Sequence, residues 1–79
     1  MYFFVVMENG GTRQAVVLRN LQELKPFLNK EGFRPLYINR VTIDPSGRPY
    51  EKRLLWTWDK YGLTIVDVCG NVAETIWRE

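Results

Sequence analysis

The sequence predicts an α+β fold: a single small domain in which one helix packs on a mostly antiparallel sheet. Three observations predict it, namely short β-rich runs, turn signals between them, and one stretch with helical spacing. In chain order these segments give β-β-α-β-β-β-β. A chain of 79 residues is too short to fill two cores, so residues 1–79 are expected to form one domain.

The first two strands are predicted to form a hairpin. Tyr2–Met7 is aromatic and β-branched almost throughout, which suits a strand covered on both faces. Asn9 and Gly10 readily supply the positive φ angles of a tight turn. Thr12–Leu18 then returns as the second strand.

The helix is predicted over roughly residues 21–31. Asn20 is a suitable N-cap, and Glu23 follows three residues later, as in a capping box. One apolar face has helical spacing and consists of Leu21, Leu24 and Leu28.

Two residues shape the expected course of this helix. Pro26 removes a hydrogen bond at a cost of about 3 kcal/mol in a helix interior, so we expect a distorted first half. Gly32 is placed to stop the helix in the left-handed conformation, with Phe33 packing back on Leu28.

A strand is predicted over Leu36–Ile43. Its apolar residues change phase near Asn39 and Arg40, which predicts a β-bulge there. The next four residues, 44–47, have Pro and Gly where a type I turn with a glycine bulge requires them.

Three further strands complete the expected sheet. Tyr50–Trp58 and Leu63–Cys69 are separated by a turn of similar chemistry. Gly70-Asn71 could close a two-residue turn onto Val72–Trp77, whose Val, Thr, Ile and Trp content favours a strand. Asn71 and Glu74 also match a helix start, which leaves a helix as the alternative for this tail.

Composition limits the classes of function. Eleven basic and nine acidic residues give a net charge of +2, which permits a nucleic-acid partner without indicating one. A single cysteine forms no intramolecular disulfide, and no apolar run approaches the ~20 residues of a membrane span. We therefore expect a cytoplasmic protein with no membrane partner.

Residue types argue against catalysis. The chain has no histidine, which removes the commonest acid–base group and the Ser-His and Cys-His nucleophile pairs. One cysteine cannot build a structural zinc site, and no phosphate-binding glycine loop is present. We therefore expect no enzymatic activity, no catalytic residues, no metal site and no cofactor.

Two residues near the end of the Leu63–Cys69 run have alternative interpretations. Asp67 interrupts that run and is expected at the solvent edge; if it faced inward, it would be a partly buried acid with a raised pKa. Cys69 is expected to be a small buried side chain rather than a reactive thiol.

The strand over Tyr50–Trp58 is the best candidate for binding. Aromatic residues and arginine are enriched in interface hot spots, and aromatics interleaved with cations also suit single-stranded nucleic acid. The alternative is that the tryptophans fill the core while the strand's start is merely solvated. The expected partner-binding residues are Arg48, Tyr50, Lys52, Arg53, Trp56 and Trp58.

The function expected from these observations is a small protein-binding module, with a homodimer through an exposed sheet edge as one form of it. Small size without catalytic parts also fits phage or mobile-element products that inhibit or modulate host protein complexes. The first alternative is an RNA- or DNA-binding protein that uses the basic aromatic strand. The second is a histidine-free ribonuclease built from Arg, Lys and Tyr.

Overall fold

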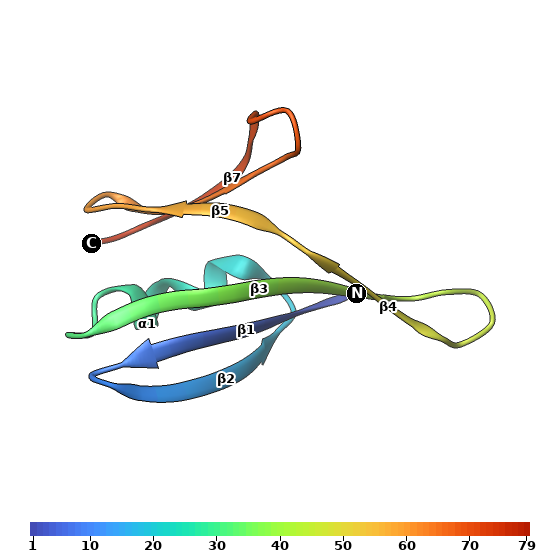
Figure 1. Ribbon diagram of the computed structural model, residues 1–79, viewed down its shortest axis with the longest axis horizontal. Helices are drawn as coiled ribbons and strands as arrows, with labels where there is room; N and C mark the ends of the chain where they lie inside the picture. Colours follow the sequence, from blue (N-terminus) through green and yellow to red (C-terminus); the bar gives the residue numbers. More distant parts are fainter.

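A computed structural model describes all 79 residues and divides the strands between two antiparallel sheets (Figure 1). The antiparallel pairing and the short helical content confirm the α+β class, but the expectation of one sheet is wrong. Sheet A has the order β2-β1-β3-β4, with bounds β1 (Tyr2–Asn9), β2 (Thr12–Leu18), β3 (Phe33–Ile43) and β4 (Pro49–Arg53). Sheet B has the order β5-β6-β7, with bounds β5 (Leu55–Trp58), β6 (Gly62–Val66) and β7 (Val72–Trp77).

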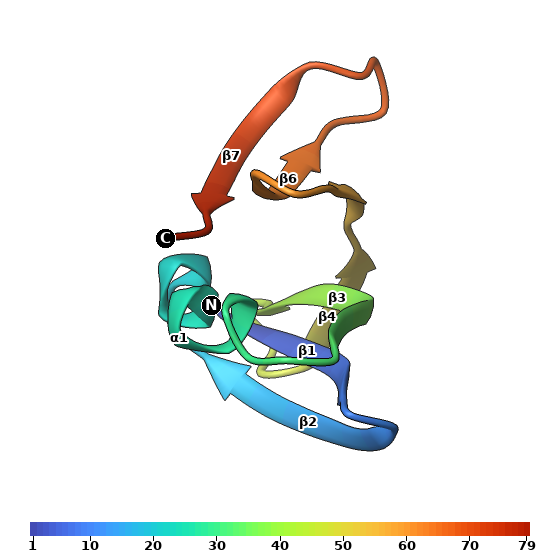
Figure 2. The same cartoon turned by 90° about the vertical axis from the view of Figure 1, so that its left-hand side faces the viewer.

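The predicted strand over Tyr50–Trp58 is broken at Leu54, where the chain leaves sheet A and enters sheet B. The N–H of Leu54 donates to the carbonyl of Ile38 at 2.8 Å, which ties this junction to β3. The break lets Trp56 and Trp58 pack against the core from the opposite layer, which a straight continuation of β4 would not allow. The two layers face each other, with the helical segment beside them (Figure 2).

The first hairpin forms, but its turn is Gly10-Gly11 rather than the predicted Asn9-Gly10, because β1 extends through Asn9. β1 and β2 pair in unbroken antiparallel register from Phe3–Leu18 to Asn9–Thr12. The two turn residues, Gly10 and Gly11, have φ angles of 58° and 87°, the left-handed values that a two-residue hairpin turn needs.

The helical segment is shorter than predicted. It consists of a 3-10 turn, η1 (Leu21–Leu24), followed by one α-helical turn, α1 (Lys25–Leu28). The predicted capping box is present, because Asn20 accepts the N–H of Gln22 and Glu23 accepts the N–H of Asn20. Pro26 lies at the start of α1, where it removes no intrahelical hydrogen bond, and this position explains the distorted first half.

Gly32 has the predicted positive φ, 78°, but it lies beyond the end of the helix. Gly32 lies against the turn of the first hairpin, where the Gly10 N–H donates to the Gly32 carbonyl at 3.2 Å. A Cβ on Gly32 would stand 2.6 Å from the backbone nitrogen of Gly10. The glycine therefore serves a close approach of two turns as well as a left-handed backbone.

The predicted bulge near Asn39 and Arg40 is wrong in position. The register between β1 and β3 shifts between Val6–Tyr37 and Met7–Pro35, so the extra residue is Leu36. Pro35 has no N–H for the ladder, and the shift there brings Phe33 and Ile38 to the same core. The phase change read from the sequence arises because Val41 is buried on the other face of the sheet from Ile38.

The core lies between the two sheets and the helical segment. Its fully buried members come from every layer and include Val5, Met7, Leu24, Leu28, Ile38, Leu63 and Ile76. The tail is a strand, β7, as favoured from its composition. The turn before it spans residues 67–71 and is longer than the predicted two-residue turn. No helix here combines the length and apolarity needed to cross a lipid bilayer.

Candidate functional site

The six predicted binding residues do not form one surface. Arg48 and Tyr50 belong to the hairpin arm that projects beyond the rest of sheet A (Figure 1), where Tyr50 is 63% exposed. Lys52 and Arg53 point to opposite faces of β4 because side chains alternate along a strand. Trp56 and Trp58, on β5, are half-buried and pack against the core.

Trp58 is held mainly by its neighbours in the core. Its ring meets that of Phe33 edge-on, with centroids 5.1 Å apart and an interplanar angle of 72°. The guanidinium carbon of Arg78 lies 5.1 Å from the Trp58 ring centroid and covers its remaining side. These contacts match the alternative in which the tryptophans are structural.

The face of sheet A that points away from sheet B has no second layer of backbone over it, although Val6 and Val41 on this face are buried. No strand or helix of the chain lies over it (Figure 2). Registers across all four strands place the following residues on it, and they are called the outer face: Tyr2, Phe4, Val6, Glu8, Arg13, Ala15, Val17, Arg34, Tyr37, Asn39, Val41, Glu51 and Arg53. Val17, at 64% exposure, is its most exposed large apolar residue.

Arg53 is held by two contacts on the outer face, one with Tyr37 and one with Asn39. Its guanidinium carbon lies 4.3 Å from the centroid of the Tyr37 ring, and its Nε donates to Oδ1 of Asn39 at 2.8 Å. Tyr37 in turn contacts Phe4, with ring centroids 6.2 Å apart. Phe4 and Asn39 are cross-strand partners, so β1, β3 and β4 all contribute.

No carboxylate neutralises Arg53. The one ion pair in the chain joins Arg34 and Glu8 at 2.9 Å, and Glu51 stays outside ion-pair distance although it shares the strand face. The terminal guanidinium nitrogens of Arg53 therefore keep their N–H donors free. A cation held in place with unused donors is arranged to receive a carboxylate or another oxyanion.

Sequence reasoning identified Arg53 but missed Phe4, Val17, Tyr37 and Asn39. The signal was present in β1, which is apolar on both faces. That pattern predicts a strand covered on both sides, whereas the second sheet covers only the side with Phe3, Val5 and Met7, and on the other side Val6 alone is buried. An aromatic face with no second layer over it gives the same pattern in sequence.

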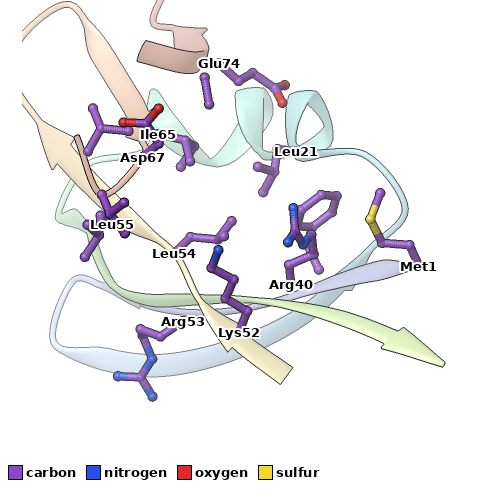
Figure 3. A pocket seen from close by; sticks show the side chains of 14 residues that line it. Met1, Leu21, Arg40, Lys52, Arg53, Leu54, Leu55, Ile65, Asp67 and Glu74 are labelled. Carbon is purple, nitrogen blue, oxygen red and sulfur yellow. The ribbon is translucent and has the colours of Figure 1, made fainter. Parts of the chain in front are cut away.

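A pocket of about 300 Å³ opens between the two sheets near Met1 (Figure 3). Phe3, Leu21 and Ile65 contribute to its apolar lining, and Arg40 and Lys52 extend toward it from sheet A. Arg53 is beside this pocket but its guanidinium points away from it (Figure 3). The pocket and the outer face are thus separate surfaces that share one strand.

Asp67 and Glu74 line the opposite side of the pocket, and both are already engaged. Asp67 lies in the exposed turn after β6, where its Oδ1 accepts the N–H groups of Cys69 and Asn71, both at 2.9 Å. Glu74 accepts the side-chain amide of Gln22 at 2.8 Å. Neither acid forms an ion pair with Arg40 or Lys52.

The structure tests the expected exposure of both Asp67 and Cys69 in this turn. The solvent-edge interpretation of Asp67 is confirmed and the raised pKa is wrong: backbone N–H donation, first from Asn71 and also from Cys69, holds the pKa of Asp67 below its ordinary value. Cys69 is exposed rather than buried, because the turn that Asp67 organises carries it away from the core.

Comparisons with models of protein families, with curated proteins and with solved structures gave no match. The structure itself defines the class, which is a small α+β protein of two antiparallel sheets. The chain's most distinct surface is the outer face, where Arg53 is fixed by Tyr37 and Asn39.

Proposed function

We propose that this chain is a non-enzymatic protein-binding module whose contact surface is the outer face, with Arg53 as its anchor. The observation that carries the proposal is the fixed, unpaired guanidinium of Arg53 on a face with the half-buried aromatic rings of Phe4 and Tyr37 and the exposed Val17. Arginine and aromatic residues dominate the energetics of protein interfaces. The partner is therefore expected to present a carboxylate flanked by apolar groups.

Preorganisation strengthens this argument. A free arginine side chain has about 2 kcal/mol of rotamer entropy to lose when it is immobilised. The stack on Tyr37 and the bond to Asn39 impose much of that order before any partner arrives. A carboxylate that meets Arg53 can form two parallel hydrogen bonds without first organising the side chain.

Apolar contacts would supply the rest of the affinity. Val17 is well exposed, and Tyr2 and Phe4 are half-buried on the same face. Burial of apolar surface contributes about 25 cal/mol per Å² removed from water. Such contacts are insensitive to salt, so the complex should survive salt concentrations that disrupt purely ionic association.

A second candidate, binding of single-stranded nucleic acid, is favoured by the aromatic rings of Tyr2, Phe4 and Tyr37 on one sheet face. The charge on this face argues for protein instead. The face carries three arginines and two glutamates: Arg34 is paired with Glu8, Arg13 is the cross-strand partner of Glu8, and Glu51 lies two residues from Arg53 on the same strand face. No feature of the arrangement favours the ribonuclease alternative.

The proposed cellular location and biological role of the module remain those expected from the sequence. The exposed thiol of Cys69 suits a reducing compartment, which supports the cytoplasm as its location. Inhibition or modulation of a host complex by a phage or mobile-element product is one form that such a binding module takes.

The test is capture of partners from a lysate of the source cells by wild-type protein and by Arg53→Gln and Val17→Lys. Lys60→Gln is a matched control, because Lys60 also lies over a tyrosine ring, that of Tyr61, at 5.1 Å. We expect a discrete protein that is retained at high salt and after nuclease treatment, and lost only with the two outer-face variants. Equal capture by all variants, or material that nuclease removes, would contradict the proposal.

A further inference from the structure

The fold leaves four sheet edges, and three of them are protected. The β4 edge begins at a proline and continues with three charged residues, Glu51–Arg53. β5 is only four residues long. On β7, the carbonyl of Thr75 is occupied by the side-chain amide of Gln22 at 3.0 Å. Prolines, charges, short strands and covering groups are the usual means by which proteins block edge pairing.

β2 has none of these protections. It runs for seven residues without proline and with an unbroken register, and Arg13 is its one charged residue. It forms the outermost strand of sheet A, with nothing alongside its free edge (Figures 1 and 2). Its backbone groups on that side therefore lack partners from this chain.

We infer that β2 pairs with β2 of a second copy of this chain, antiparallel and about a two-fold axis. Two four-stranded sheets would then join into one sheet of eight strands. A strand can serve both sides of such an interface only if its sequence is compatible with its own reverse. The charge pattern of β2 satisfies this requirement.

The backbone alternation identifies the groups that pair. The two-residue turn makes Asn9 and Thr12 a hydrogen-bonded pair, so hydrogen-bonded and open positions alternate from there along β2. The N–H and C=O groups of Arg13, Ala15 and Val17 consequently point away from β1. They form a continuous row that an antiparallel strand can bind.

Charge then selects the register. With Ala15 on the two-fold axis, Arg13 lies opposite Val17 of the partner subunit, and no like charges meet. A register centred on Arg13 would place two arginines directly opposite each other, which is destabilising. The Ala15-centred register also covers part of Val17, which is 64% exposed in the single chain.

A two-fold axis between antiparallel strands stands perpendicular to the sheet, so both outer faces would lie on the same side. The dimer would thus present two Arg53 sites to one partner surface. The pairing itself rests on the β2 edge and does not depend on the proposed function.

Oligomeric state provides the first test. We expect light scattering to give twice the 9.4 kDa chain mass at high concentration, with dissociation as the sample is diluted. Ala15→Pro removes an N–H that points outward and leaves the bonds to β1 intact, so it should give a folded monomer. Ala15→Thr keeps the N–H and is the matched control, which should remain dimeric.

Amide hydrogen exchange tests the interface by residue. In the dimer the amides of Arg13, Ala15 and Val17 should exchange at least about tenfold more slowly than in the dilute monomer. The amides of Gln14 and Val16 face β1 and should be protected in both states. A chain that stays monomeric at high concentration, or a dimer in which the three outward amides still exchange freely, would overturn the inference.

Discussion

The guanidinium carbon of Arg53 on β4 lies 4.3 Å from the centroid of the Tyr37 ring on β3. The two residues are not direct cross-strand partners, since Arg53 pairs with Asn39, so the contact is diagonal across the strand pair. The contact makes Arg53 an ordered part of the sheet surface, in contrast to the alternative of a merely solvated strand start. The consequences can be measured in stability as well as in binding.

The stack should contribute modestly to folding. An exposed cation–π contact is worth about 0.5–1 kcal/mol, so Arg53→Gln should lower the free energy of unfolding by about that amount in urea titrations. Arg53→Lys should not restore binding, because lysine lacks the Nε–H that bonds to Asn39. A double-mutant cycle with Tyr37→Leu should give a favourable coupling energy; full additivity would show that the contact contributes nothing.

The aromatic residues of the broken strand should behave differently from one another. Trp58 packs against Phe33, so Trp58→Ala should cost about 3 kcal/mol of unfolding free energy. Tyr50 projects from the arm, and Tyr50→Ala should change stability by less than about 0.5 kcal/mol. If partner binding is lost in Tyr50→Ala while the fold is intact, the arm belongs to the interface as the sequence predicted.

Tryptophan fluorescence should separate the three indoles. Trp77 is 59% exposed, whereas Trp56 and Trp58 are half-buried against the core. Acrylamide should therefore quench mainly Trp77, and Trp77→Phe should remove most of the accessible fraction. Unchanged quenching in that variant would place an exposed indole elsewhere.

Acid should weaken two turns. The pKa of Asp67 is lowered chiefly by the Asn71 backbone N–H, and that of Asp44 chiefly by the Ser46 hydroxyl. A carboxyl with a lower pKa in the folded state contributes stability above its unfolded pKa, and that stability is lost as pH falls through the folded value. The free energy of unfolding should decline below about pH 4. The combined Asp44→Asn and Asp67→Asn variant should show a smaller decline; an equal decline would assign it to other groups.

Two glycines should differ in their tolerance of alanine. Gly47 has a φ of 84° with open space around it, so Gly47→Ala should cost only the left-handed penalty of about 1–2 kcal/mol. Gly32 has a similar φ, but its Cβ would also approach the Gly10 nitrogen to 2.6 Å. Gly32→Ala should therefore cost about 1–3 kcal/mol more, as measured by thermal or urea unfolding. Equal costs would mean that the two turns can move apart freely.

Several parts of the fold were predictable because local chemistry determines them. The hairpin turn at Gly10, the capping box at Asn20 and the strand over Val72–Trp77 each depend on residues within a few positions of one another. The turn over residues 44–47 also follows its sequence, since the Gly47 N–H donates to the Asp44 carbonyl at 2.9 Å and Gly47 has a φ of 84°. Of the outer-face residues, only Arg53 could be identified in this way.

The sequence by itself determined where most strands and turns form, because turn residues and β-branched runs act over short range. The tertiary structure alone decided that the strand breaks at Leu54, that the bulge falls at Leu36 and that only one face of β1 receives the second sheet. Apolar side chains on both faces of a strand indicate only that the solvent exposure of each face is reduced in the fold. Which side receives the second sheet depends on how residues distant in sequence pack, and no local pattern records that choice.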